Sequence, residues 1–141
     1  GYDVVGVDVD ASMLDMARTA APELDWRLDD LASFDLGPGF RHAFDVVLVA
    51  GNTIPLLEPG TLREVCRRLG AHLAPDGAVV CGYGLDAAHL PTGCPPMDLA
   101  EADAAFGALG LEVVARYGTW DRQPFEPADG YAVTVYAEPR R

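Results

Sequence analysis

The sequence contains no lysine, so its ten positive side chains are all arginines. Against them stand 22 acidic residues, which give a formal net charge of -12 at pH 7. The longest basic runs are the pairs Arg67–Arg68 and Arg140–Arg141. A protein that follows a nucleic-acid backbone needs a basic face that displaces counterions from the phosphates. The composition therefore predicts that neither nucleic acid nor an anionic membrane is a partner.

Cysteine is scarce as well, and Cys66, Cys81 and Cys94 form no Cys-x-x-Cys pair. An odd number of widely spaced cysteines argues against a disulfide framework and against a zinc site, so we expect no bound metal. Long apolar runs and a signal-peptide pattern are also lacking. These absences favour a protein of the reducing cytoplasm.

Half of the residues are hydrophobic, and they form strand-like and helix-like segments in alternation. Helices are expected from the N-cap Asp10 to Pro22 and over 62–73 and 99–109; strands are expected over 3–9, 24–28, 44–50, 78–83, 111–117 and 131–137. Strands that alternate with helices predict a doubly wound α/β fold with a parallel sheet. The last two strands have no helix between them and should form an antiparallel hairpin at the sheet edge. The apolar segment 44–50 is typical of a central strand covered on both faces.

Acidic residues follow the first two expected strands. Ligands of open α/β sheets bind outside the carboxyl ends of the strands, where Asp8 and Asp30 are expected. A carboxylate at Asp8 can accept both hydroxyls of a ribose, and one at Asp30 can accept the amine of adenine. Val9 and Leu31 would then contact the rings. Ordinary solvated strand-end acids would give the same pattern, and the spacing alone leaves both interpretations open.

Four segments together resemble the class I S-adenosylmethionine-dependent methyltransferases. They are GYDVVGVDVDASMLDMAR (1–18), LDWRLDDLASFDL (24–36), AFDVVLVAGNTIPLL (43–57) and LREVCRRLGAHLAPDGAVV (62–80). In that family the corresponding segments bind the ribose, bind the adenine, form the central strand with its loop, and form the following helix, turn and strand. The final pair of strands matches the family's antiparallel hairpin. The resemblance covers nearly the whole chain in the family's order.

This resemblance implies a Rossmann-like sheet, S-adenosyl-L-methionine as cofactor, and methyl transfer to a small-molecule acceptor. The family's first strand and glycine-rich loop have no counterpart in the sequence. We therefore expect residues 1–141 to form a single, partial methyltransferase domain, in which the absent strand would lie between the strands ending at Asp8 and Ala50. Carried over by position, the cofactor-binding residues are Asp8 and Val9 at the ribose, Asp30 and Leu31 at the adenine, and Ala50, Gly51 and Asn52 beside the methionine part.

Other interpretations remain beside this one. A non-catalytic nucleotide-binding or interaction domain of Rossmann type fits the same sheet. The strand over 44–50 is also similar to the central strand of short-chain dehydrogenases. Their catalytic Tyr–Lys pair cannot be built here, because the sequence contains no lysine. The sequence singles out no catalytic residue, which methyl transfer tolerates because the sulfonium already activates the methyl group. His89 follows a strand end on the expected ligand side, either as a general base or, more commonly for such a position, as a solvated loop histidine. His72 is expected to be an exposed helix residue.

Overall fold

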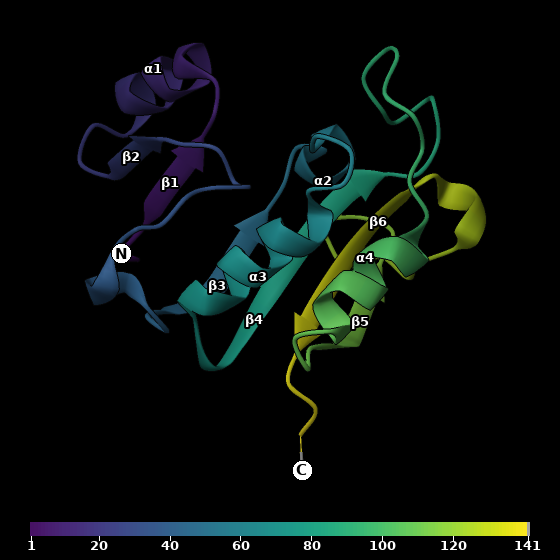
Figure 1. The fold of residues 1–141 in the computed structure, drawn as a ribbon. Helices are drawn as coiled ribbons and strands as arrows, with labels where there is room; N and C mark the ends of the chain where they lie inside the picture. The colour runs from purple at the N-terminus through teal and green to yellow at the C-terminus, as the bar shows by residue number, and fades with distance from the viewer. Residues whose placement is uncertain (141) are drawn as a thin grey trace. The chain divides into compact units, whose positions relative to one another are not determined.

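A computed structural model describes residues 1–140, which divide into two compact units, 1–35 and Leu36 onward (Figure 1). The first unit contains β1 (Val5–Asp8), α1 (Ala11–Ala20) and β2 (Asp25–Leu28). The second contains β3 (Phe44–Val49), α2 (Thr53–Leu56), α3 (Leu62–His72), β4 (Leu73–Gly84), α4 (Leu99–Gly107), β5 (Glu112–Tyr117) and β6 (Tyr131–Ala137), with 3-10 turns at Pro38–Phe40 and Pro127–Asp129.

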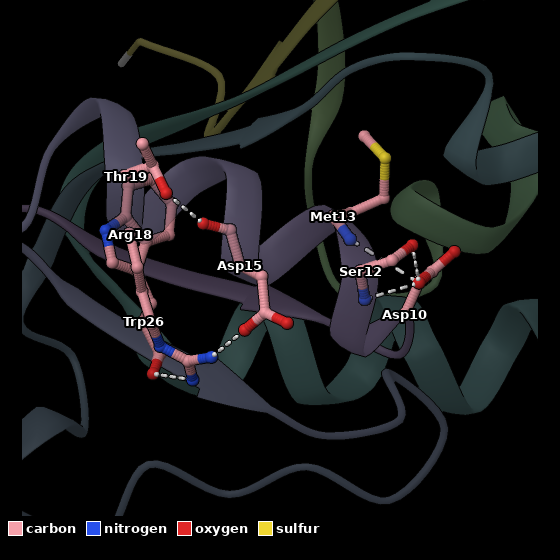
Figure 2. A network of polar contacts seen from close by, with 7 residues as sticks. All are labelled: Asp10, Ser12, Met13, Asp15, Arg18, Thr19 and Trp26. Atoms are coloured by element: carbon pink, nitrogen blue, oxygen red, sulfur yellow. Dashed lines mark hydrogen bonds and ion pairs between the residues drawn. The ribbon is translucent and has the colours of Figure 1, made fainter.

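The first unit is a β–α–β arrangement in which β1 and β2 pair in parallel, with Asp8 opposite Leu28. Helix α1 begins as predicted, because the Asp10 carboxylate accepts a hydrogen bond from the backbone N–H of Ser12 at 2.8 Å. Further along the helix, Asp15 pairs with Arg18 at 3.3 Å (Figure 2). These contacts join near neighbours in the chain and lie at the surface.

The second unit contains a four-stranded sheet in the order β3-β4-β6-β5. Strand β3 is parallel to β4, whereas β6 is antiparallel to both β4 and β5. The predicted antiparallel hairpin is therefore present, but it is not simply added at the edge. Strand β6 lies inside the sheet and β5 forms the edge, which suits their burial: β6 is mostly buried, whereas the first half of β5 is exposed. Of the described strands in this sheet, β6 alone runs against the others, and the fold is a mostly parallel α/β fold as predicted.

Helices α3 and α4 cover one face of this sheet (Figure 1). The apolar stripe predicted for residues 62–73 is buried there through Val65, Cys66 and Leu69. From α4, the Phe106 ring packs on Tyr136 of β6 with 4.4 Å between the ring centroids. These side chains form the main core of the unit.

The prediction that the strand over 44–50 is covered on both faces is wrong for the described chain. Val46 and Leu48 of β3 are 58% and 62% exposed, whereas Val49 is buried, because successive side chains of a strand alternate between the two faces of a sheet. Within residues 1–140, β1 pairs with β2 alone and β3 with β4 alone. Each strand thus has one unpaired edge, in agreement with the prediction that an inner strand of the family's sheet has no counterpart here.

Strand β4 also begins earlier than predicted. It was expected over 78–83, after the turn within the segment 62–80, but Leu73 already pairs with Phe44 of β3. Asp76 accommodates the turn inside the strand with a left-handed φ of 64°, a conformation that aspartate tolerates better than most residues. The short helix α2 was not predicted, since four residues carry no helical periodicity.

Candidate functional site

The carboxyl ends of β1 and β2 lie next to each other in the first unit. The backbone N–H of Asp29 donates to the carbonyl of Asp8 at 3.0 Å, which extends the ladder beyond the last strand pair. The Asp8 carboxylate uses Oδ1 to accept the N–H of Asp10 at 2.9 Å. Within residues 1–140 its Oδ2 has no hydrogen bond, so the side chain is held in place with one oxygen to spare.

Asp30 lies at the same edge of the first unit, one residue beyond Asp29. Its side chain is exposed, and its Oδ1 accepts the N–H of Ala32 at 2.8 Å. The carbonyl of Asp30 accepts the N–H of Phe34 at 2.7 Å, and the buried Phe34 ring anchors the loop. Of the predicted ring contacts, Val9 is 70% exposed and Leu31 is half-buried. The four predicted adenosine contacts therefore come from one pair of adjacent strand ends.

The remaining predicted cofactor residues, Ala50, Gly51 and Asn52, belong to the second unit. Gly51 and Asn52 both adopt left-handed conformations, with φ values of 69° and 61°. Two such residues in succession reverse the chain at the end of β3, and α2 starts immediately afterwards at Thr53. Glycine and asparagine are the residues that accept this backbone most readily, which explains their presence at these positions.

The side chain of Asn52 is committed to the protein itself. Its Oδ1 accepts the N–H of Gly84 at 2.7 Å, and its Nδ2 donates to the carbonyl of His89 at 3.2 Å. The amide thus joins the loop after β3 to both ends of the turn that follows β4. Asn52 was predicted as a cofactor contact; the structure gives its side chain a positioning role that the sequence analysis did not include.

The turn after β4 presents an aspartate–histidine pair. Asp86 Oδ1 accepts the backbone N–H groups of Ala88 and His89, and it lies 2.7 Å from Nδ1 of the His89 ring. Because a carboxylate can only accept, Nδ1 carries the proton in the neutral ring, and Nε2 is then the acceptor nitrogen. The hydrogen bond from His89 is the main cause that lowers the pKa of the Asp86 carboxyl. Both side chains are about half exposed, at 42% for His89 and 49% for Asp86.

Gly130 makes this close packing possible. The N–H of Leu85 donates to the carbonyl of Gly130 at 2.7 Å, which draws the turn against the start of β6. A Cβ at residue 130 would collide with the Asp86 carboxylate and lie 2.7 Å from Nδ1 of His89. The backbone φ of 69° at Gly130 also disfavours a side chain there. The pair is therefore shaped by three separate segments of the chain.

The sequence analysis left His89 open between a general base and a solvated loop histidine and did not connect it with Asp86, although Asp-x-x-His after a strand end is a signal for such a pair. The side chain of Asp86 forms an Asx turn, which is a short-range pattern. The contacts with Asn52 and Gly130 are long-range and give no recognisable sequence pattern.

The prediction that His72 is exposed is wrong. The side chain is buried, its Nε2 accepts the N–H of Leu36 at 3.2 Å, and its Nδ1 donates to the Arg68 carbonyl.

The two buried thiols, Cys66 and Cys81, show no sign of activation. Burial raises the pKa of Cys66 to about 12, and burial likewise raises the pKa of Cys81. A nucleophilic cysteine requires the opposite change, a lowered pKa that favours the thiolate.

Among residues 1–140, no group of three or more His, Cys, Asp or Glu side chains could hold a metal ion. No helix in the same range is long and apolar enough to cross a membrane.

A mostly parallel α/β fold with acidic strand ends and an antiparallel penultimate sheet strand is the arrangement of class I methyltransferases. Residues 1–77, more than half of the chain, match a family model described as a methyltransferase domain. The chain belongs to this family. No curated protein matches the sequence.

Solved structures agree with the family. A TehB-like SAM-dependent methyltransferase from Corynebacterium glutamicum is 25% identical, with a TM-score of 0.82 over 99% of this chain and 70% of that one. The CcbJ methyltransferase from Streptomyces caelestis is 24% identical, with a TM-score of 0.79 over 99% and 76%. The glycopeptide N-methyltransferase MtfA, solved with S-adenosyl-L-methionine, is 15% identical, with a TM-score of 0.73 over 99% and 74%. These matches confirm the predicted family, fold and class of cofactor.

Proposed function

We propose that this protein transfers the methyl group of S-adenosylmethionine to a small-molecule acceptor. The observation that carries the proposal is the pairing of two acidic strand ends in the first unit, where Asp29 donates its N–H to the carbonyl of Asp8 and Asp30 follows directly. In an open α/β sheet this is the edge at which nucleotide ligands bind. Membership of the methyltransferase family makes the nucleotide an S-adenosyl cofactor.

In this proposal the cofactor contacts are the residues that the family resemblance implies. Asp8 binds the ribose hydroxyls through its uncommitted Oδ2, with Val9 beside the sugar, and Asp30 with Leu31 binds the adenine edge. In the second unit, the backbone of Ala50, Gly51 and Asn52 lies beside the methionine part. We also propose, as the sequence predicts, that residues 1–141 form a single, partial methyltransferase domain.

The acceptor is proposed to be a small molecule because the chain carries a net charge of -12 without a basic stripe. A polyanionic acceptor would be repelled by such a surface. We expect no retention of the protein on duplex DNA or RNA at physiological salt. Retention that weakens steeply with added salt would make a nucleic-acid acceptor a candidate again.

We also propose that the protein resides in the cytoplasm, because its three cysteines are unpaired, as is usual in a reducing compartment.

Calorimetry with S-adenosylhomocysteine tests the cofactor site. Asp8→Ala in the full-length protein should weaken binding by roughly tenfold to a hundredfold, since one hydrogen bond to a charged group contributes about 1.5–3 kcal/mol. The matched control is Asp3→Ala, which removes an exposed acid before the start of β1, away from the carboxyl end of the strand. Equal affinity of wild type and Asp8→Ala would remove Asp8 from the site.

A further inference from the structure

The amide of Asn52 brings the aspartate–histidine pair to the loop in which the methyl group is expected. Gly51 and Asn52 lie beside the sulfonium in the proposed function, and Asn52 binds the backbone at Gly84 and at His89. His89 is therefore one side chain away from the proposed position of the transferred methyl group. All of these residues belong to the second unit, so this neighbourhood is fixed within one compact body.

The pair has the geometry of a proton acceptor. Asp86 accepts the Nδ1 proton of His89 at 2.7 Å, which fixes the tautomer with its lone pair on Nε2. A carboxylate in this place also stabilises the imidazolium after it has taken up a proton. With 42% of its side chain exposed, His89 is open to a ligand.

The other groups around His89 do not compete for this role. The ring of Tyr131 lies tilted beside the imidazole, with 6.4 Å between the ring centroids. Asp129, next to Gly130 in the chain, directs its carboxylate to the N–H of Glu126 at 3.1 Å. Asp86 is thus the carboxylate that faces the imidazole among the described residues.

We propose that His89, oriented by Asp86, removes the proton from the methyl-accepting atom, and that the acceptor is therefore a hydroxyl or a protonated amine. The acceptor lone pair forms the new bond to the methyl carbon while the S–CH₃ bond breaks and its electron pair stays on sulfur. The proton of the acceptor moves to Nε2 of His89, and the imidazolium later releases it to water. An acceptor that is already ionised, such as a carboxylate, would need no such base. This inference rests on the proposed function.

Sinefungin tests the proposal without knowledge of the acceptor. In this unreactive analogue a carbon bearing an amine replaces the methylated sulfonium, so the amine points where the methyl group would leave. Neutral His89 can accept a hydrogen bond from that amine, directly or through one water. We expect the wild-type full-length protein at pH 8 to prefer sinefungin over S-adenosylhomocysteine by about fivefold or more in calorimetry. The preference should weaken as the pH is lowered, because a proton on the His89 ring would repel the ammonium group of sinefungin.

Substitutions of His89 test whether this residue causes the preference for sinefungin. His89→Ala should abolish the preference while S-adenosylhomocysteine binding persists, and His89→Gln should remove its dependence on pH. The control His42→Gln alters a histidine that precedes β3, at the opposite end of that strand, and should change neither property. If both ligands bind but the preference and its pH dependence survive both His89 substitutions, the proposal is overturned. If neither ligand binds the wild-type protein, the proposed function itself fails, and the inference fails with it.

The substitution Asp86→Asn tests whether Asp86 acts as a positioning residue for His89. Asparagine keeps an oxygen for the N–H groups of Ala88 and His89, so the turn should persist. Without the carboxylate charge the imidazolium is less favoured, and the preference for sinefungin should extend to lower pH. An unchanged pH profile would show that Asp86 only shapes the turn, which would contradict its part in the proposal.

Discussion

The two units hold their polar side chains in different ways. In the first unit, Figure 2 shows polar contacts that are mostly local and exposed: the Asp10 side chain caps the start of α1, and Asp15 pairs with Arg18 three residues further along the helix. In the second unit Asp103 of α4 binds Arg116 of β5 at 2.6 Å and accepts the hydroxyl of Tyr136 of β6 at 2.7 Å. Local contacts shape single elements, whereas the second kind joins three elements into one body.

The two units also differ in the size of their hydrophobic cores. Leu14 and Phe34 are the fully buried hydrophobic residues of the first unit, which has one helix on two strands of four residues. The second unit buries the remainder of the hydrophobic core, including Phe106 and Tyr136, whose rings pack in a tilted arrangement. A two-stranded sheet is marginally stable by itself. The second unit should therefore supply most of the free energy of unfolding.

The largest expected effect comes from a pair of matched substitutions in the two units. Asp103→Ala leaves the half-buried Arg116 without its carboxylate and should lower the free energy of unfolding by about 2–3 kcal/mol. Asp15→Ala breaks the exposed pair with Arg18 and should cost about 0.5 kcal/mol or less. Urea denaturation measures both. Equal effects of the two substitutions would break the comparison between the units.

The next effect concerns two glycines that lie beneath tryptophan rings. A Cβ at Gly6 of β1 would collide with the ring of Trp26, and one at Gly82 of β4 with the ring of Trp120. Trp26 is partly buried and donates to the carbonyl of Ala21 at 2.8 Å, so its ring cannot move without losing that bond. Trp120 is 46% exposed, and its Nε1 donates to the Tyr131 hydroxyl at 3.0 Å in an exposed hydrogen bond that water can replace when the ring swings outward.

Gly6→Ala should therefore lower the free energy of unfolding by about 1–3 kcal/mol, the usual cost of overpacking. Gly82→Ala should cost less and should instead shift the fluorescence of Trp120 as its ring enters solvent. Each variant is measured with a Trp→Phe background that leaves one tryptophan as reporter. A larger loss of stability for Gly82→Ala would mean that Trp120, despite its exposure, is the better anchored ring.

Sequence reasoning reached the local features and stopped at the long-range ones. The Asp10 cap follows from residues two apart, and the α3 stripe follows from helical periodicity; both are present. The insertion of β6 between β4 and β5 depends on which strand buries more surface after folding. The clamp of Asn52 on the turn after β4 joins residues 32 and 37 positions apart. No periodicity predicts such a contact, so the contacts that hold the turn of His89 against the loop of Asn52 emerge only in three dimensions.

The smallest effect tests whether the kind of contact matters more than the unit in which it occurs. Glu64 belongs to the second unit, but its partners Arg67 and Arg68 lie on the next turn of α3, so its contacts are local, and the one with Arg67 is exposed. The hydrogen bond from Arg67 is the main cause that lowers the pKa of the Glu64 carboxyl to about 2. In the first unit, the hydrogen bond from the Ser12 hydroxyl is the main cause that lowers the pKa of Asp10.

A carboxyl with a lowered pKa in the folded state stabilises the fold above the pKa of the unfolded chain, about 4.3 for glutamate, and loses this contribution as pH falls through the folded value. The Tm difference between wild type and Glu64→Gln should therefore be small and constant from pH 6 to 8, and should shrink between about pH 4 and pH 2. Asp10→Asn should show a smaller difference, because asparagine retains the oxygen that caps α1. Thermal melts over this pH range measure both. A Tm loss for Glu64→Gln at pH 7 as large as that for Asp103→Ala would show that membership of the second unit, rather than the length of the contact, determines its contribution.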